Sequence, residues 1–412
     1  MMIVHHRLAH AARALIACAL WVGGAAQAQH AMPGASIAPP ASGAPIKIAD
    51  PTSVVMIVNR DSNEIAFMDI KTRKMVGRTF LGNNVNPHMV MMSPDGRYVV
   101  TGGTRSNTAY IIDSRTLELV KKIPVGFAPE HLAFSPDGRF YYQGNPEGDS
   151  ITVIDMASLK VIKTIEGLVE PLNITFTPDG SKAYVGNYAA HWIGVIDVSR
   201  HELLKKIQLG KVPAIARLDP SRSLSKVKGG SNATPSPDGR LLYVADTDLG
   251  IVSVIDTRED KVIKTIRVGL APWRVYMDHD GKYAISVNNG DATISIIDLA
   301  KNEVVATLES GPDLTGVNFG SGKAFVISSS TGFLYVYDMK TLRNAGRLKI
   351  GVNTQIETAT TDAQDRKLYL ASSTDNSVYV IDTLTEVVER VPNVGLYPWG
   401  THIMDSKDNY CH

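Results

Sequence analysis

Short runs of alternating apolar and polar residues fill the chain from residue 54 onward. Within residues 129–168 such runs occupy 131–135, 140–143, 150–155 and 160–165. The runs are rich in Val, Ile, Tyr and Thr, and clusters of Gly, Pro, Asn, Asp and Ser separate them. This pattern is typical of β-strands joined by hairpin turns. The stretch therefore predicts a four-stranded antiparallel meander.

The same unit of four runs recurs along the chain. The third run of each unit ends in an apolar residue followed by Asp, at Asp69, Asp113, Asp155, Asp197, Asp256, Asp298, Asp338 and Asp382. The intervals between these residues are 44, 42, 42, 59, 42, 40 and 44. A four-strand repeat of about 42 residues is typical of a β-propeller, so the sequence predicts an all-β fold. We expect eight blades, with seven as the alternative.

The two ends of the repeat region each supply part of one unit. Residues 54–59 match the second run of the unit, and residues 398–405 match the first run. We therefore expect the N- and C-terminal strands to pair in one blade and close the ring. Closure removes the unpaired strand edges that would otherwise promote aggregation.

Four phrases carry a resemblance to a known family: AYVGN (183–187), LYVAD (242–246), VSVIDT (252–257) and VIKTIRVGLAP (262–272). They resemble the YVTN-type β-propeller repeat family, over about residues 54–412. The resemblance implies the fold and leaves the function open, because relatives by fold include surface-layer domains, lactonases and haem d1-carrying domains. Many YVTN proteins have seven blades, whereas haem d1 domains have eight.

Residues 1–28 have the pattern of a secretory signal peptide. Arg7 and Arg13 precede an apolar stretch, and Ala-Gln-Ala at 26–28 is a cleavage site of the A-x-A type. Residues 29–53 are rich in Pro, Ala and Ser without periodicity, which predicts a flexible leader before a propeller domain at 54–412. These features predict a periplasmic or secreted protein without a membrane span.

Charge and cysteine content exclude several classes of partner. Lys and Arg number 42 against 41 Asp and Glu, and the predicted cleavage removes two arginines and no acid. Such a balance gives no attraction to nucleic acid or to anionic lipid. Cleavage also removes Cys18 and leaves Cys411 without an internal disulfide partner, unless residues 15–18 are a lipoprotein signal. We expect a monomer stabilised by packing.

Histidines gather on one predicted face, which we call the upper end because each first strand begins there. His88, His131 and His402 lie where first strands begin, and His191 lies in a second-to-third strand connection at the same end. Neutral imidazoles at converging strands are credible ligands for copper, zinc or iron, or for the axial position of a non-covalent haem. The alternative is that each histidine hydrogen-bonds to nearby backbone.

Other candidate ligand-binding residues occur at the same end. An insertion at about 213–235 includes Arg217 and is rich in basic residues, which predicts a cationic flap that attracts an anionic ligand. Arg274, Glu130 and Trp399 lie near first-strand starts and complete the predicted ligand site. Glu130 and Glu357 are also candidate acid/base groups.

The sequence contains no nucleophile elbow, phosphate-binding loop or dinucleotide fingerprint. We therefore expect a non-enzymatic binding or scaffold protein that recognises a small anionic ligand, a metal or a periplasmic protein at the upper end. The alternative is a metal- or haem-dependent periplasmic oxidoreductase, or a cofactor-handling protein, that uses the histidines. A lactonase-like hydrolase is a third hypothesis.

Overall fold

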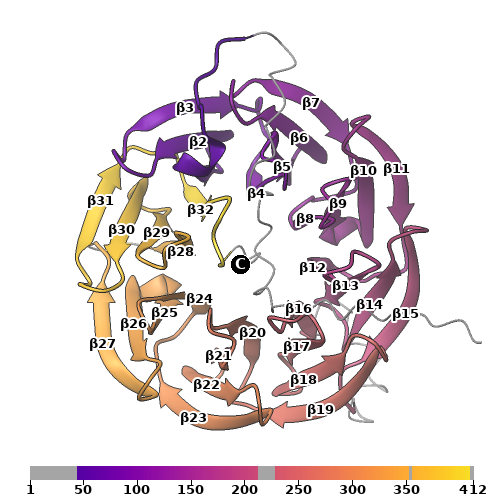
Figure 1. Ribbon diagram of the computed structural model, residues 1–412, viewed down its shortest axis with the longest axis vertical. Coiled ribbons are helices and arrows are strands. Elements are labelled where there is room, and N and C mark those ends of the chain that lie inside the picture. Colours follow the sequence, from indigo (N-terminus) through magenta and orange to yellow (C-terminus); the bar gives the residue numbers. More distant parts are fainter. Residues whose placement is uncertain (1–43, 212–227, 352–354, 409–412) are drawn as a thin grey trace, which may run out of the picture.

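The strands form a ring of antiparallel sheets around a central axis (Figure 1). The computed structural model describes residues 44–211, 228–351 and 355–408. The fold is an all-β propeller built from four-stranded antiparallel blades, as the sequence predicted. Within the described ranges, none of the helices has the length and apolar character needed to cross a membrane.

The first half of the ring runs clockwise in Figure 1 from β1 to β15. One sheet contains β1 (Val54–Asn59), β2 (Glu64–Asp69) and β3 (Met75–Phe80), together with β32 (Pro398–His402). The next two contain β4 (Pro87–Met92), β5 (Tyr98–Gly103), β6 (Thr108–Asp113) and β7 (Leu119–Pro124), then β8 (Leu132–Phe134), β9 (Phe140–Asn145), β10 (Ser150–Asp155) and β11 (Lys160–Ile165).

An eight-stranded sheet follows, made of two four-strand halves. These are β12 (Pro171–Phe176), β13 (Lys182–Asn187), β14 (Trp192–Asp197) and β15 (Glu202–Gln208), then β16 (Gly230–Pro235), β17 (Leu241–Asp246), β18 (Ile251–Asp256) and β19 (Lys261–Arg267). A single paired position, Asn187 opposite Gly230, joins the halves.

Three further four-stranded sheets complete the ring. They are β20 (Pro272–Met277), β21 (Tyr283–Asn288), β22 (Thr293–Asp298) and β23 (Glu303–Glu309); β24 (Leu314–Gly320), β25 (Lys323–Ser328), β26 (Phe333–Asp338) and β27 (Arg343–Lys349); and β28 (Ile356–Thr361), β29 (Lys367–Ser372), β30 (Ser377–Asp382) and β31 (Val388–Pro392). Short 3-10 helices lie at η1 (Pro51–Ser53), η2 (Pro146–Gly148) and η4 (Ser329–Thr331).

The first strand of each unit lies nearest the axis, and we call these the inner strands: β4, β8, β12, β16, β20, β24, β28 and β32 (Figure 1). β32 pairs antiparallel with β1, with His402 opposite Met56, so the two ends of the repeat region meet in one sheet as expected. The strand ends at His402 rather than at the predicted residue 405.

Apolar side chains fill the layers between neighbouring sheets. One cluster joins Met56 of β1 to Val90 of β4, and another joins Phe325 of β25 to Leu368 of β29. Both faces of the second and third strands are covered, which is why their burial is nearly continuous. The outer strands alternate instead, because one of their faces meets solvent.

The repeated Asp and the Pro-Asp-Gly turns are structural. The Asp155 carboxylate accepts a hydrogen bond from the Ser158 backbone N–H at 2.8 Å, which fixes the turn after β10. In the turn before β9, Gly138 has φ 70°, a conformation that other residues adopt only with strain.

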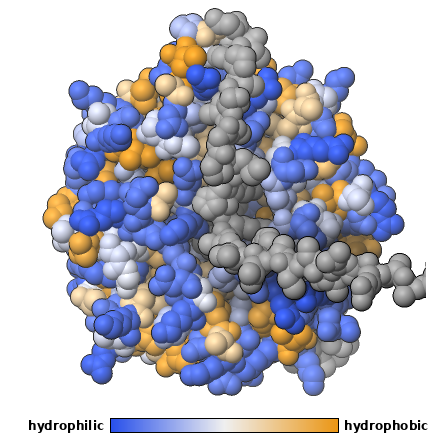
Figure 2. Space-filling model, viewed as in Figure 1, coloured by the Kyte–Doolittle hydropathy of each residue, from blue (hydrophilic) through white to orange (hydrophobic). Residues whose placement is uncertain are grey.

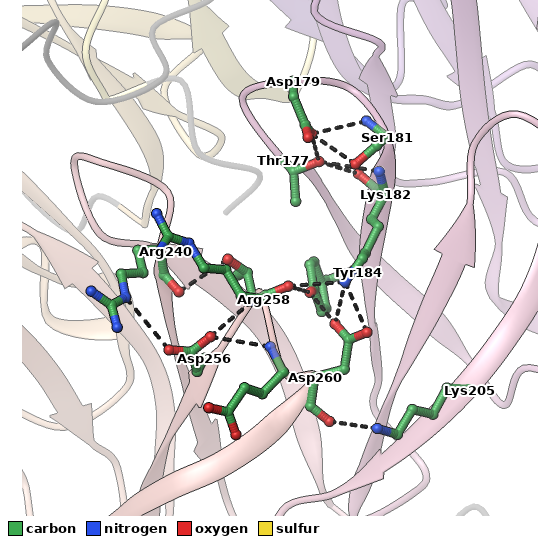
Figure 3. Close-up of polar contacts among 12 residues, drawn as sticks. Thr177, Asp179, Ser181, Lys182, Tyr184, Lys205, Arg240, Asp256, Arg258 and Asp260 are labelled. Carbon is green, nitrogen blue, oxygen red and sulfur yellow. Dashed lines mark hydrogen bonds and ion pairs between the residues drawn. The ribbon is translucent and has the colours of Figure 1, made fainter. Parts of the chain in front are cut away.

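Polar contacts also join neighbouring sheets at the lower end, where the inner strands finish. Figure 3 shows the contact between the halves of the eight-stranded sheet: Lys182 Nζ lies 2.8 Å from a carboxylate oxygen of Asp260. Lys205 Nζ donates to the Asp260 carbonyl at 2.9 Å. These contacts hold β13 and β15 of one unit to the last turn of the next unit.

Two boundaries differ from the sequence prediction. Residues 44–53 are not a flexible leader: Ile48 is buried, and its N–H donates to the Arg115 carbonyl at 3.0 Å. The predicted insertion ends before 235, because β16 begins at Gly230. Its sequence, GSNATP, has low strand propensity, and packing overrides that preference. Residues 1–43, with the predicted signal peptide and Cys18, and Arg217 and Cys411 lie outside the described residues.

The face of the ring in Figure 2 is predominantly hydrophilic, with apolar residues scattered in small groups. Singly exposed apolar side chains are normal on soluble proteins. In the described chain, exposed large apolar side chains include Phe127, Leu270 and Leu396 in the connections that lead to inner strands.

Candidate functional site

The candidate site occupies the upper end of the ring axis, where several inner strands begin. His88 is the second residue of β4, Glu357 the second of β28 and Trp399 the second of β32, and each follows a Pro or Ile at the strand start. We call the site the mouth and define it by these three residues with Arg60, Glu130, His131 and Arg274.

A repeated irregularity of the inner strands positions these side chains. In β4, Pro87 pairs with Gly103 but Val90 pairs with Thr101, so three steps on one strand oppose two on the other. The same shift occurs in β20 between Pro272 and Val275. β-Bulges of this kind turn side chains away from the regular alternation. His88 lies within the first bulge and Arg274 within the second.

Aromatic rings from three sheets meet in the mouth. The ring centroid of His88 lies 5.9 Å from that of His131 and 5.4 Å from that of Trp399. The Arg60 guanidinium lies 4.5 Å from the centroid of the Trp399 ring. Arg60 is fixed there by the Asn86 side-chain oxygen, which accepts from its Nε at 3.2 Å and its Nη2 at 2.8 Å. These contacts place a cation over an aromatic cluster.

Two buried polar atoms in this cluster have no hydrogen-bond partner within the described part of the chain. They are Nδ1 of His88 and Nε1 of Trp399. Buried polar atoms are nearly always paired in folded proteins, so each exception calls for an explanation. A bound molecule that supplies the missing partners would explain both.

The mouth histidines are held in their neutral form. Burial, reinforced by the charges of Arg60 and Arg274, lowers the pKa of His88 to about 3. Burial, with the same arginine charge at 274 and the neighbouring His88, places the pKa of His131 well below 6.5. A neutral imidazole has one lone pair available to a hydrogen-bond donor or a metal.

Opposite charges surround the rings. Burial raises the pKa of Glu130, while the charges of Arg60 and Arg274 oppose the increase. Burial likewise raises the pKa of Glu357, against a 2.7 Å hydrogen bond from the Ser373 hydroxyl and the charge of Arg60. The positive charges of both arginines also lower the pKa of His88.

The structure thus brings together His88, His131, Glu130, Arg274 and Trp399 from the predicted set. Glu130 Oε2 lies 3.9 Å from His131 Nε2. Arg274 is 2% exposed, and its guanidinium lies 5.0 Å from the centroid of the Trp273 ring.

Two predicted metal ligands lie apart from this aromatic cluster. His191 Nδ1 lies 2.8 Å from an Asp246 carboxylate oxygen, and this hydrogen bond raises the histidine pKa. His402 is buried near the lower end of β32, where desolvation lowers its pKa to about 3. Among the described residues, no group of three or more His, Cys, Asp or Glu side chains is arranged to hold a metal ion. A single histidine acting as a ligand stays a prediction.

Sequence reasoning missed Arg60, which lies between β1 and β2. The signal was present, because Arg60 directly follows the second strand of its unit, and the equivalent positions of the other units carry uncharged residues. It also missed Trp273, whose ring centroid lies 5.2 Å from that of Tyr188. A Pro-Trp pair begins both β20 and β32, and this repetition marks both positions.

Comparison with known proteins supports the fold and leaves the activity open. A family model described as "Lactonase, 7-bladed beta-propeller" matches residues 82–215. A search of curated proteins found no match. The family match spans less than half of the chain, so it supports a propeller family without assigning the chain to the lactonases or to the YVTN repeats.

Solved structures share the architecture at low sequence identity. "Dihydro-heme d1 dehydrogenase NirN in complex with DHE" has a TM-score of 0.72 at 18% identity, covering 87% of this chain and 76% of that one. Hydrazine synthase from Kuenenia stuttgartiensis has a TM-score of 0.54 at 20% identity, covering 76% and 96%. A functionally unknown protein from Desulfotomaculum acetoxidans has a TM-score of 0.54 at 12% identity, covering 85% and 98%. These likenesses establish the propeller fold alone.

Proposed function

We propose that this protein is a propeller that binds a small anionic ligand at its mouth. The observation that carries the proposal is the pair of unpartnered buried atoms, His88 Nδ1 and Trp399 Nε1, beside the guanidinium of Arg60. Leaving such an atom without a partner costs about 1–3 kcal/mol, which a ligand would recover.

The chemistry of these groups selects the ligand. Trp399 Nε1 can only donate, so the ligand must offer an acceptor there. Arg60 supplies a permanent positive charge in the same place, which favours a carboxylate or phosphate as that acceptor. Arg274 adds a second buried cation in the mouth. The rings of Trp399 and His88 favour a ligand with a flat apolar part.

Calorimetric titration with phthalate, citrate and inorganic phosphate tests the proposal. We expect saturable binding of at least one of these anions by the wild type. Arg60→Gln should weaken it by at least about 10-fold, the equivalent of one charge-assisted hydrogen bond. Arg139→Gln is the matched control, because Arg139 lies over the Phe140 ring at the lower end. Absence of binding, or equal affinity in both variants, would contradict the proposal.

A second candidate is the handling of a non-covalent haem-type cofactor. The specific observation is the pair of neutral imidazoles, His88 and His131, beside two arginines. One axial histidine suffices for a haem, and arginines are suited to its carboxylates. His88 or His131 would hold the iron, which would supply redox chemistry when bound. The fold likeness to the haem d1 dehydrogenase is compatible with this role.

Haemin titration separates the second candidate from the first. Binding should shift the Soret band, and His88→Ala or His131→Ala should change the axial-ligand spectrum. His201→Ala is the control, because His201 Nδ1 lies 2.7 Å from the Tyr142 hydroxyl, away from the mouth. An unchanged spectrum in both mouth variants would exclude His88 and His131 as haem ligands.

The lactonase-like hypothesis is supported by the family match over residues 82–215.

We further propose that the ring has eight blades, with each half of the eight-stranded sheet as one blade. Two observations support the count: a single paired position joins the halves, and eight apolar clusters lie between successive four-strand units of the described chain. Membership of the YVTN-type repeats, export to the periplasm or medium and a monomeric state are parts of the same proposal.

A further inference from the structure

One inner strand is attached differently from the others. Each of the inner strands β4, β8, β12, β16, β20, β24 and β28 continues through a lower-end turn into the second strand of its own unit. β32 has no such turn, because its neighbour β1 comes from the other end of the repeat region. Like β4 and β20, β32 has four paired positions and a register shift, here after Val58. Its lower end therefore needs another attachment.

The segment that follows β32 supplies one. Residues 403–408 leave the lower end of β32 and are buried at Ser406 and Asp408. The Asp408 carboxylate accepts hydrogen bonds from the side chains of Asn318, at 3.0 Å, and Thr361. His279 Nε2 lies 2.7 Å from its other oxygen. Asp408 thus joins β32 to β24, to β28 and to the turn after β20.

A second layer of contacts holds the partners of Asp408. His279 Nδ1 lies 2.9 Å from Asp365, and Lys407 Nζ lies 2.8 Å from the same carboxylate. The Ser406 hydroxyl accepts from the Asp408 backbone N–H at 3.0 Å. Asp408 is 1% exposed, so the contacts of its own carboxylate act where water cannot replace them, whereas the side chain of Lys407 is 39% exposed.

The strand that this segment holds also carries the mouth tryptophan. Trp399 lies at the upper end of β32, three residues before His402, and contacts His88 and Arg60. A strand is stiff over such a length, so displacement of its lower end alters the register or position of its upper end.

We propose that residues 403–408 form a clasp that replaces the missing hairpin of β32 and, through that strand, fixes Trp399 in the mouth. The clasp is therefore a positioning device for the ligand site, and its effect on affinity rests on the proposed function. Ligand affinity at the upper end depends on contacts made at the lower end. Coupling of this kind requires an element whose position both ends influence, and β32 is that element.

Asp408→Asn tests the proposal, because it removes the charge while keeping the size of the side chain. Hydrogen exchange of residues 398–402 should become at least about 10-fold faster, since the strand loses its lower attachment. Exchange in β12, on the far side of the ring, should stay unchanged. Asp260→Asn is the matched control, because Asp260 is a buried lower-end carboxylate that pairs with Lys182 between two other units and lies outside residues 403–408. Asp408→Ala provides a stronger version of the same change.

The second readout is phthalate affinity by calorimetry. We expect Asp408→Asn to weaken it by at least about 10-fold while Asp260→Asn leaves it unchanged. Unchanged exchange in β32 would overturn the clasp, and faster exchange with unchanged affinity would overturn the coupling. If wild-type protein binds none of the test anions, the proposed function fails separately. The coupling is then decided by whether exchange at residues 87–92, beside Trp399, also becomes faster in Asp408→Asn.

Discussion

His88 at one end of the ring axis and His279 at the other are both largely shielded from solvent, but in opposite electrical surroundings. At the mouth, His88 lies beside arginine charges, and burial lowers its pKa to about 3. At the clasp, burial alone would lower the pKa of His279, but the charges of Asp408 and Asp365 raise it to about 10. One histidine is therefore neutral and the other charged at neutral pH.

The two histidines also differ in how completely their ring nitrogens are paired. Both ring nitrogens of His279 face a carboxylate oxygen within 2.9 Å. At the mouth, Nδ1 of His88 and Nε1 of Trp399 have no partner in the described chain. Removing one partner of a buried ion pair is strongly destabilising, whereas a neutral buried atom without a partner already costs stability and calls for another explanation. From this difference we expect His279 to serve stability and His88 to serve recognition.

The largest expected effect comes from breaking the lower cluster. His279→Leu should reduce the free energy of unfolding by about 3–5 kcal/mol, because it leaves the buried Asp408 carboxylate without its cation. Urea unfolding followed by fluorescence measures the change. The control is His201→Leu, which removes a neutral hydrogen bond to Tyr142 and should cost less, about 1 kcal/mol. Equal losses of unfolding free energy in His279→Leu and His201→Leu would show that the charged contacts of His279 add no special stability.

Replacing the mouth histidine His88 by an apolar residue should leave the free energy of unfolding nearly unchanged or increase it. His88→Phe keeps an aromatic ring and removes the unpartnered Nδ1, so the free energy of unfolding should change by less than about 1 kcal/mol or increase. Anion binding should be lost in the same variant. A loss of stability as large as that of His279→Leu would show that His88 serves folding.

The pH dependence of stability should have opposite slopes for the two ends. The pKa of His279 is raised from 6.5 to about 10, so its contribution is complete below 6.5 and disappears as the pH rises towards 10. The pKa of His88 is lowered to about 3, so the unfolded chain binds more protons and stability falls as the pH drops from 6.5. Both slopes are measured by the free energies of unfolding of the wild type, His279→Leu and His88→Phe between about pH 3 and pH 10. Each variant should lack the slope of the histidine that it replaces.

The smallest effect on stability is expected for an ion pair between the outermost strands β11 and β15. This pair provides a reference for both ends of the axis. Lys163 Nζ lies 3.2 Å from Glu202 across two sheets, with side chains 40% and 54% exposed. Glu202→Gln should change the unfolding free energy by less than about 1 kcal/mol, because solvent screens the pair. High salt should remove even that difference, and a larger loss would mean that exposed pairs hold neighbouring sheets together.

The architecture was predictable because it rests on local, repeated chemistry. The strands β10 and β11 begin and end where the apolar runs do, and each repeated Asp fixes a turn within a few residues of itself. The mouth was predictable in part, since strand order alone places His88, His131, Arg274 and Trp399 at one end.

What the sequence could not predict depends on contacts between distant segments. Arg60 reaches the mouth because Asn86 and Trp399, the second of them more than 300 residues away in sequence, hold it there. His402 appeared equivalent to His88, but it lies three residues after Trp399, near the other end of its strand. Asp408 follows the last recognisable run, and its role appears only when His279 is placed beside it.

Closure of the ring by β1 and β32 has a consequence for the order in which the chain folds. The Asn59 side chain donates to the carbonyl of Val394, 335 residues away in sequence. Most strand pairs form within one local unit. The pairing of β1 with β32 instead needs nearly the whole chain, and strand pairs so far apart in sequence form slowly. Until β32 arrives, β1 presents an open edge that another chain's β32 could occupy. Refolding at increasing protein concentration should therefore produce strand-exchanged dimers at the expense of monomers.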